Sequence, residues 1–192
     1  MTNFTIIGTG NMGSAIGGVL AAGGSDVTHV AREELGTAPL TGDAVILAVP
    51  YSAVDDIIAA YGHQLAGKIV VDITNPLDFA TFDSLVVPAG SSAAAQLQAK
   101  LPGSKVLKAF NTNFAATLAS TLIGGLPTTV LIAGDDADAK NALVAAIEAG
   151  GVSALDAGAL ARAHELEALG FLQLTLAASD KIAWTAGYAL VR

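Results

Sequence analysis

The sequence predicts an α/β fold built on a doubly wound, mostly buried parallel sheet, and three observations lead to it. Short apolar runs alternate with segments of helical pattern along the 192 residues, which is typical of a parallel sheet covered by helices. Hydrophobic residues make up 53% of the chain and charged residues only 14%, as expected for strands buried on both faces. A glycine-rich turn joins the first apolar run to the first helical segment.

Strands are expected where Val, Ile and other apolar residues run almost without interruption, and helices where apolar residues recur at helical spacing. Asp135 and Asp136 favour a helix start, because acidic groups stabilise the positive end of the helix dipole. In chain order we expect strand 4–8, helix 11–22, strands 26–31 and 44–49, helix 52–61, strand 68–73, an irregular segment to 90, helix 92–101, strands 105–110 and 128–133, helix 137–149 and a short strand 153–156.

Two regions depart from regular alternation. Too few residues lie between Arg32 and the strand near Ala44 for a helix and a strand, since a parallel crossover takes a dozen or more residues. The first half of the sheet is therefore expected to lack its second helix and third strand. From about 159 to 188 the pattern is helical, with a weak point near 177–180. We expect residues 1–158 to form the sheet domain and 159–192 a C-terminal helical segment packed on it, as one domain overall.

Composition excludes several classes of function. Nine basic and seventeen acidic residues give a formal charge of −8, so the chain lacks the clustered Lys and Arg of a nucleic-acid-binding surface. The absence of cysteine excludes disulfides, thiolate metal sites and cysteine nucleophiles. The longest uncharged stretch, 109–134, is interrupted by Asn, Gly and Pro, so no membrane span is expected. No signal peptide is visible at the N-terminus, and a cytoplasmic protein is expected.

The glycine-rich turn has the spacing G-x-G-x-x-G at Gly8, Gly10 and Gly13, after a strand and at the start of a helix. The first glycine permits a tight turn, the second a close approach of the backbone to a pyrophosphate, and the third close contact between helix and strand. A turn that merely connects strand and helix is the alternative. In this context the motif favours a dinucleotide-binding fold of the Rossmann type.

The second strand carries no carboxylate at its end, where NAD-binding proteins usually have one for the adenosine ribose. It ends in Ala31 and Arg32, and a guanidinium can bind a phosphate through two parallel hydrogen bonds. The sequence therefore favours NADP. Alternatively, Arg32 is a solvated side chain paired with Glu33 or Glu34, two acidic groups that also disfavour a bound phosphate.

No residue is assigned to catalysis or to metal binding. The three histidines are expected to be structural or solvated: His29 lies in a strand, His63 in a turn flanked by glycine, and His164 on a helix. None of them has partners that would complete a catalytic triad. Glu165 and Glu167 are interpreted, with His164, as a charged helix face.

Four short segments resemble the family of NADPH-dependent deazaflavin oxidoreductases, also called coenzyme F420-dependent NADP oxidoreductases. They are IIGTGNMG at 6–13, VILAVPY at 45–51, VVDITNPL at 70–77 and VLKAFNT at 106–112, with AGDD at 133–136 and DAG at 156–158. The resemblance covers most of the chain, and the NPL and KAFNT pieces are more specific than the glycine motif. The family also includes cytoplasmic domains of membrane ferric reductases, so the resemblance implies NADPH more securely than it implies the acceptor.

The resemblance also implies which residues bind the cofactor NADP(H). Residues of the glycine turn would hold the pyrophosphate, Arg32 the adenosine phosphate, and residues after the third strand the nucleotide. Asn75 and Pro76 would lie near the nicotinamide ribose, and 109–112 would form the floor beneath the nicotinamide and the acceptor ring. The full set is Gly8, Thr9, Gly10, Asn11, Met12, Gly13, Ala31, Arg32, Val49, Pro50, Tyr51, Asn75, Pro76, Ala109, Phe110 and Asn111.

The resemblance implies hydride transfer between the nicotinamide and a planar acceptor, a deazaflavin such as coenzyme F420 or a flavin, with little protein acid–base chemistry. Two other functions stay open: a non-catalytic NADP(H)-binding redox sensor and a reductase of a small imine. The apolar C-terminal segment, which includes Phe171 and Trp184, predicts a homodimer whose acceptor pocket this segment partly closes. A monomeric mass by light scattering would contradict the dimer.

Overall fold

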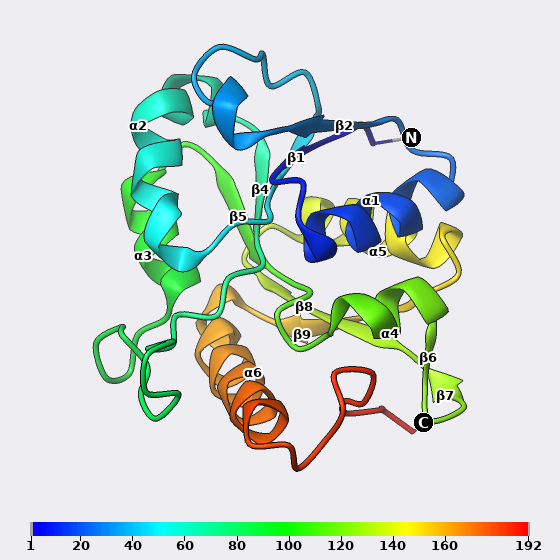
Figure 1. The fold of residues 1–192 in the computed structure, drawn as a ribbon. Helices are drawn as coiled ribbons and strands as arrows, with labels where there is room; N and C mark the ends of the chain where they lie inside the picture. Colours follow the sequence, from blue (N-terminus) through cyan, green and yellow to red (C-terminus); the bar gives the residue numbers. More distant parts are fainter. Residues whose placement is uncertain (1, 192) are drawn as a thin grey trace.

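The computed structural model describes residues 2–191, which form a seven-stranded sheet with helices on both faces (Figure 1). The strand order is β2-β1-β3-β4-β5-β8-β9. The first five strands in this order are parallel, whereas β8 is antiparallel to β5 and β9 is parallel to β8. The bounds are β1 Phe4–Ile7, β2 Val27–Val30, β3 Ala44–Leu47, β4 Ile69–Asp72, β5 Lys105–Lys108, β8 Thr129–Gly134 and β9 Ser153–Gly158.

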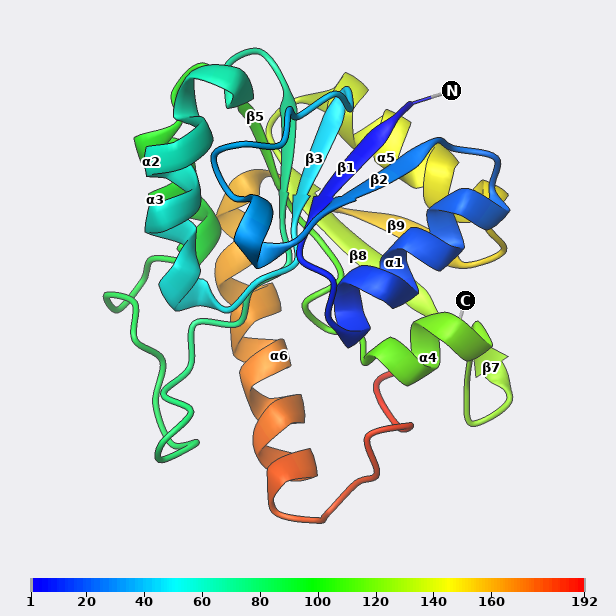
Figure 2. The ribbon, with the colours of Figure 1, turned by 45° about the horizontal axis from the view of Figure 1, so that its top comes forward.

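Two hydrophobic cores lie on the two faces of this sheet. Ile6 and Ile46 face the core beneath α1, α4 and α5, and Ile7 and Leu47 face the core beneath α2 and α3. Because successive strand side chains point to opposite faces, these strands read as continuous apolar runs. Figure 2 shows the two helical layers, with α6 beside the ends of the strands. The helices are α1 Asn11–Ala22, α2 Val54–Leu65, α3 Ala93–Lys100, α4 Ala115–Ser120, α5 Ala137–Ala149 and α6 Ala163–Ala178.

The expected shortening of the first half is confirmed. Between β2 and β3 the chain forms one 3-10 turn, η1 (Arg32–Glu34), and β2 is an edge strand. Tyr61 on α2 donates a hydrogen bond to the carbonyl of Glu34 (3.2 Å), and Leu40 is buried against the same helix layer. The short connection is thus fixed to α2 by packing rather than by a further strand.

The structure corrects three expectations. The sheet is not wholly parallel, because an apolar run does not encode strand direction and β8 runs antiparallel to β5. Along the chain, α4 and a hairpin of β6 (Leu122–Ile123) and β7 (Leu126–Pro127) lie between β5 and β8, and the sequence did not predict these elements. The C-terminal helix ends at Ala178, where Asp180 takes a left-handed φ of 56°, and the tail that follows is irregular rather than helical.

None of the helices within residues 2–191 is both long and apolar enough to cross a membrane.

Candidate functional site

The glycine turn lies where β1 meets α1, and its backbone geometry excludes a larger residue at Gly8. Gly8 has φ +122°, and a Cβ atom there would lie 2.2 Å from the carbonyl oxygen of Ala48. α1 begins at Asn11 after Gly10, and no side chain caps it. Its first N–H groups are therefore available to an anionic ligand at the positive end of the helix.

Two cavities lie on either side of this turn. The first, the Arg32 cavity, has a volume of about 430 Å³ and is lined by Gly8, Gly10, residues of β2, η1 and α2, and residues that follow β3. The second, the Asn111 cavity, has a volume of about 400 Å³ and is lined by Asn11 and Met12 together with residues that follow β4 and β5. One turn thus contributes to both cavities, so a single elongated ligand can extend from one to the other past the N-terminus of α1.

The Arg32 cavity contains one basic side chain. Arg32 is exposed and forms no ion pair with any residue of the described chain. The carboxylate of Glu34 instead accepts a hydrogen bond from the backbone N–H of Ala31 at 2.8 Å. Asp56, in the first turn of α2, contributes a carboxylate to the lining. The guanidinium is therefore free to bind an anion.

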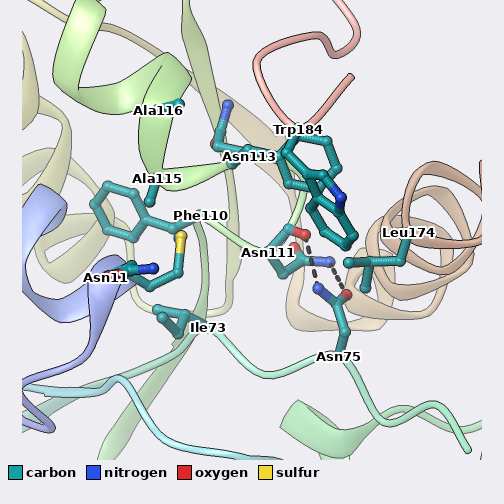
Figure 3. Close-up of a pocket in the computed structure, with 12 residues that line it drawn as sticks. Asn11, Ile73, Asn75, Phe110, Asn111, Asn113, Ala115, Ala116, Leu174 and Trp184 are labelled. Atoms are coloured by element: carbon teal, nitrogen blue, oxygen red, sulfur yellow. Dashed lines mark hydrogen bonds between the residues drawn. The ribbon is translucent and has the colours of Figure 1, made fainter. Parts of the chain in front are cut away.

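The Asn111 cavity is built around a pair of asparagines (Figure 3). Asn75 donates to the backbone carbonyl of Asn111 (2.9 Å), and the Asn111 amide donates to Asn75 Oδ1 (3.0 Å) and to the carbonyl of Leu166 (2.8 Å). Both partners of the Asn111 amide nitrogen are acceptors, which fixes the orientation of the amide. Asn111 Oδ1 is consequently buried without a donor.

Aromatic and apolar side chains form the rest of this cavity. Phe110 is fully buried and has a left-handed φ of 62°, an uncommon and strained conformation for a residue with a side chain. Trp184 in the C-terminal tail packs on Phe114 with ring centroids 5.0 Å apart, and Leu174 of α6 lies beside it (Figure 3). None of the lining residues is titratable, so the cavity suits a planar, uncharged ring.

Helix α6 approaches the asparagine pair very closely at Gly170. A Cβ atom there would lie 2.3 Å from Asn75 Oδ1 and 2.9 Å from Asn111 Nδ2. Only a glycine permits this approach, because either amide would have to move for a methyl group. Helix α6 thus forms one wall of the Asn111 cavity, and the asparagine pair holds it there through Leu166.

A buried ionic cluster of Lys108, Asp72 and Glu167 joins the ends of β4 and β5 to α6. Lys108 Nζ lies 2.9 Å from Asp72 Oδ2 and 2.9 Å from Glu167 Oε1, and donates to the carbonyl of Thr74 at 2.6 Å. Glu167 also accepts from the backbone N–H groups of Ala93 (2.8 Å) and Ala94 (3.3 Å) at the start of α3. All three charged side chains are at most 2% exposed.

The cluster corrects the interpretation of Glu167 as part of a charged helix face. Burial raises the pKa of the Glu167 carboxyl, while Lys108 and the amides of α3 oppose that rise. Glu167 shares the ammonium group of Lys108 with a second carboxylate, that of Asp72.

His63 is also placed differently than expected, in α2 rather than in a turn. His164 contacts the carbonyl of Ser91 through Nδ1 (3.0 Å), and across residues 2–191 no group of acidic or histidine side chains could hold a metal ion.

Comparisons with known proteins agree with this geometry. The family model described as "NADP oxidoreductase coenzyme F420-dependent" matches residues 26–76. The F420-dependent NADP reductase of Methanocaldococcus jannaschii is 35% identical over 67% of this chain and 59% of its own length. A crystal structure of a putative F420-dependent NADP-reductase from Arthrobacter sp. FB24 superposes with a TM-score of 0.85 at 25% identity and covers 100% of both chains.

The chain is therefore similar to coenzyme F420-dependent NADP oxidoreductases over about two thirds of its length. Another relative is the metalloreductase STEAP3 of Rattus norvegicus, 36% identical over 58% of this chain and 22% of that protein. The chain therefore spans 59% and 22% of the lengths of these two curated relatives. The resemblance inferred from the four sequence segments is confirmed.

In the structure the predicted binding residues fall into three groups. Gly8, Gly10, Arg32, Val49 and Pro50 line the Arg32 cavity. Asn11, Met12, Asn75, Phe110 and Asn111 line the Asn111 cavity. The remaining predicted residues line neither cavity: Thr9, Gly13, Ala31, Tyr51, Pro76 and Ala109.

Tyr51 shows why sequence position alone misplaces a side chain. It directly follows Pro50, but its hydroxyl donates to Gln96 on α3 at 2.9 Å. The tyrosine therefore lies between α2 and α3 and lines a third, smaller cavity of about 100 Å³. Tyr51 lines neither of the two larger cavities.

Sequence reasoning missed part of the site. Asn113, Phe114, Ala115 and Ala116 line the Asn111 cavity, but the helix α4, which begins at Ala115, was not predicted. Asn113 lies two residues after Asn111, and this repeat of amides after a strand end was a usable signal. The buried cluster was missed because no sequence pattern indicates that Asp72, Lys108 and Glu167 meet.

Proposed function

We propose that this chain is an NADP-dependent oxidoreductase that transfers a hydride between NADP(H) and a planar acceptor, a deazaflavin such as coenzyme F420 or a flavin. The observation that carries the proposal is the pair of cavities joined by one glycine turn. A dinucleotide lying across the turn would have its pyrophosphate at the N-terminus of α1, its adenosine phosphate near Arg32 and its nicotinamide near Asn111.

The residues present fit the nicotinamide end of such a cofactor. Asn111 Oδ1 is a buried acceptor with no donor inside the protein, and a carboxamide N–H would satisfy it, which removes a cost of about 1–3 kcal/mol for an unpaired buried polar group. When bound, the reduced nicotinamide supplies one hydride, hence two electrons, to the acceptor ring, and solvent supplies the proton that completes the reduction. Phe110, Phe114 and Trp184 would hold the rings together and exclude water.

A non-catalytic redox sensor remains the second candidate, because no titratable side chain lines the Asn111 cavity. Turnover separates the two functions. After loading with NADPH, the chain is mixed in turn with a deazaflavin, FMN and a ferric chelate, and the absorbance of the reduced nicotinamide is followed. An oxidoreductase oxidises bound NADPH with at least one acceptor. Tight binding without oxidation by any of them would favour the sensor.

The role of Arg32 is testable by substitution. Arg32→Ala is expected to weaken NADPH binding by about tenfold or more, because it removes a charge-assisted contact to the adenosine phosphate, and to leave NADH binding nearly unchanged. Isothermal calorimetry with both nucleotides measures the difference. Arg162→Ala, which removes an exposed Arg paired only with Glu165, is the matched control. Equal losses for NADPH and NADH would contradict the assignment.

The surface of α6 and the tail also bears on assembly. Leu172 and Trp184 are 50% and 52% exposed, respectively, so apolar area is left uncovered on α6 and on the tail. The homodimer inferred from the apolar C-terminal segment stays a prediction, tested by the mass in solution. A cytoplasmic location likewise stays a prediction.

A further inference from the structure

Asn113 is a second buried amide at the Asn111 cavity whose oxygen has no donor. The residue lies in the turn between β5 and α4, lines the cavity and is 5% exposed. Its Nδ2 donates to the carbonyl of Thr129 on β8 at 3.1 Å, and its backbone N–H donates to the carbonyl of Phe110 at 3.0 Å. Asn113 Oδ1 is left without a hydrogen-bond partner.

The orientation of this amide is fixed by its surroundings. A flipped side chain would place Oδ1 against the Thr129 carbonyl, so two acceptors would face each other. The unpaired oxygen is therefore a consequence of the fold. Because a buried acceptor without a donor is costly and uncommon, Asn113 marks a place where a ligand N–H is missing.

Asn113 lies on a different side of the cavity from the groups that adjoin the glycine turn. Figure 3 shows Asn113 below α4 and beside Trp184, whereas Asn11 and Ile73 lie on the far side of Phe110. The proposed function places the nicotinamide amide at Asn111, which is hydrogen-bonded to Asn75. The space beside Asn113, Phe114 and Trp184 is left for the second reactant.

We propose that Asn113 selects the hydride acceptor by accepting a hydrogen bond from an N–H at the edge of its planar ring. The aromatic rings of Phe114 and Trp184 supply flat contact area, and Asn113 Oδ1 supplies the directional contact that apolar packing lacks. The ligand class is a fused heteroaromatic ring with an imide N–H, the pyrimidinedione edge that flavins and deazaflavins share. This inference rests on the proposed hydride transfer and adds the specificity-determining residue.

The test compares two ligands that differ only at the imide nitrogen. Riboflavin and 3-methylriboflavin are titrated, by quenching of their fluorescence, against the full chain saturated with NADP⁺. The wild type is expected to bind riboflavin about tenfold more tightly than its methylated derivative, the effect of losing one hydrogen bond to a buried acceptor. In Asn113→Ala this preference disappears, because the substitution removes the acceptor and leaves room for the methyl group.

Controls separate this role from a structural one. Asn141→Ala, at an exposed position of α5, is expected to keep the wild-type preference. If Asn113 only anchors its turn to Thr129, both ligands weaken equally in Asn113→Ala and the inference fails. The inference also fails if the preference for riboflavin persists in Asn113→Ala, or if the wild type binds neither flavin. A loss of affinity for NADP⁺ in Asn113→Ala would likewise contradict it, because it would place Asn113 on the nicotinamide side of the cavity.

The same titrations distinguish this inference from the proposed function. NADP⁺ binding without any preference between the two flavins overturns the role of Asn113 and leaves the proposed function intact. If the chain binds no NADP⁺ but still prefers riboflavin over 3-methylriboflavin in a way that depends on Asn113, the acceptor site is supported and the proposed function is contradicted.

Discussion

Lys108→Met is expected to lower the free energy of unfolding by about 3–5 kcal/mol, because it leaves two buried carboxylates without their cation. Asp72 and Glu167 are at most 2% exposed and both lie 2.9 Å from Lys108 Nζ. Methionine keeps much of the volume and apolar stem of lysine, so the loss reports mainly on charge. Urea denaturation followed by circular dichroism measures it.

The matched control is Lys105→Met on the same strand. Lys105 pairs with Asp136 at 3.1 Å, and its side chain is 44% exposed, so its loss is expected to cost no more than about 1 kcal/mol. Equal losses of unfolding free energy in Lys108→Met and Lys105→Met would mean that burial does not determine how much the cluster contributes to stability. A stable Lys108→Met protein would contradict the account of how α6 is held.

The decrease in the free energy of unfolding caused by Lys108→Met is also expected to depend on pH. Burial raises the pKa of Glu167, and removing the ammonium group raises it further, so the folded variant binds protons more tightly than its unfolded chain. Stability of such a protein increases as the pH falls toward the ordinary range of carboxylates. The deficit relative to wild type is therefore larger at pH 7 than at pH 5.5, and a deficit independent of pH would contradict this electrostatic cause.

Gly8→Ala is expected to cost about 2 kcal/mol or more of stability and to abolish measurable NADPH binding. The residue has φ +122°, and a Cβ would meet the Ala48 carbonyl at 2.2 Å, so the turn must move. If the turn moves, the first N–H groups of α1 move as well and no longer lie where they would bind the pyrophosphate. Thermal unfolding and calorimetric titration of NADPH measure the two effects.

Gly10→Ala is the matched control within the same turn. A Cβ at Gly10 meets no atom within 4 Å, so stability is expected to change by less than about 1 kcal/mol. Cofactor affinity should still fall by about tenfold or more, because the methyl group occupies the space where the pyrophosphate approaches the backbone. Unchanged affinity in Gly10→Ala would show that the phosphates bind elsewhere.

Most of the sheet could be predicted from the sequence because buried parallel strands are long apolar runs separated by helical segments. The absence of a helix and strand after Arg32 followed from chain length alone, and the structure confirms it. The direction of β8 could not be predicted, since the same apolar run fits either direction. The apolar residues after Ala178 do not form a helix. One of them, Trp184, packs on Phe114 at the Asn111 cavity.

The candidate site could be predicted where backbone geometry demands particular residues, and less well where side-chain direction decides. Gly8 and Asn75 lie at strand ends, and both line a cavity. Tyr51 follows a strand end as well, but packing against Gln96 turns its side chain away. Glu167 was misinterpreted because helical spacing does not show that its face is buried against Lys108.

The central claim is that one NADP(H) molecule spans both cavities, and a crystal structure of the chain with NADP⁺ tests it most directly. We predict the pyrophosphate at the N-terminus of α1, the adenosine phosphate beside Arg32, and the nicotinamide amide within hydrogen-bond distance of Asn111 Oδ1. A nucleotide bound with its nicotinamide outside the Asn111 cavity would contradict the account.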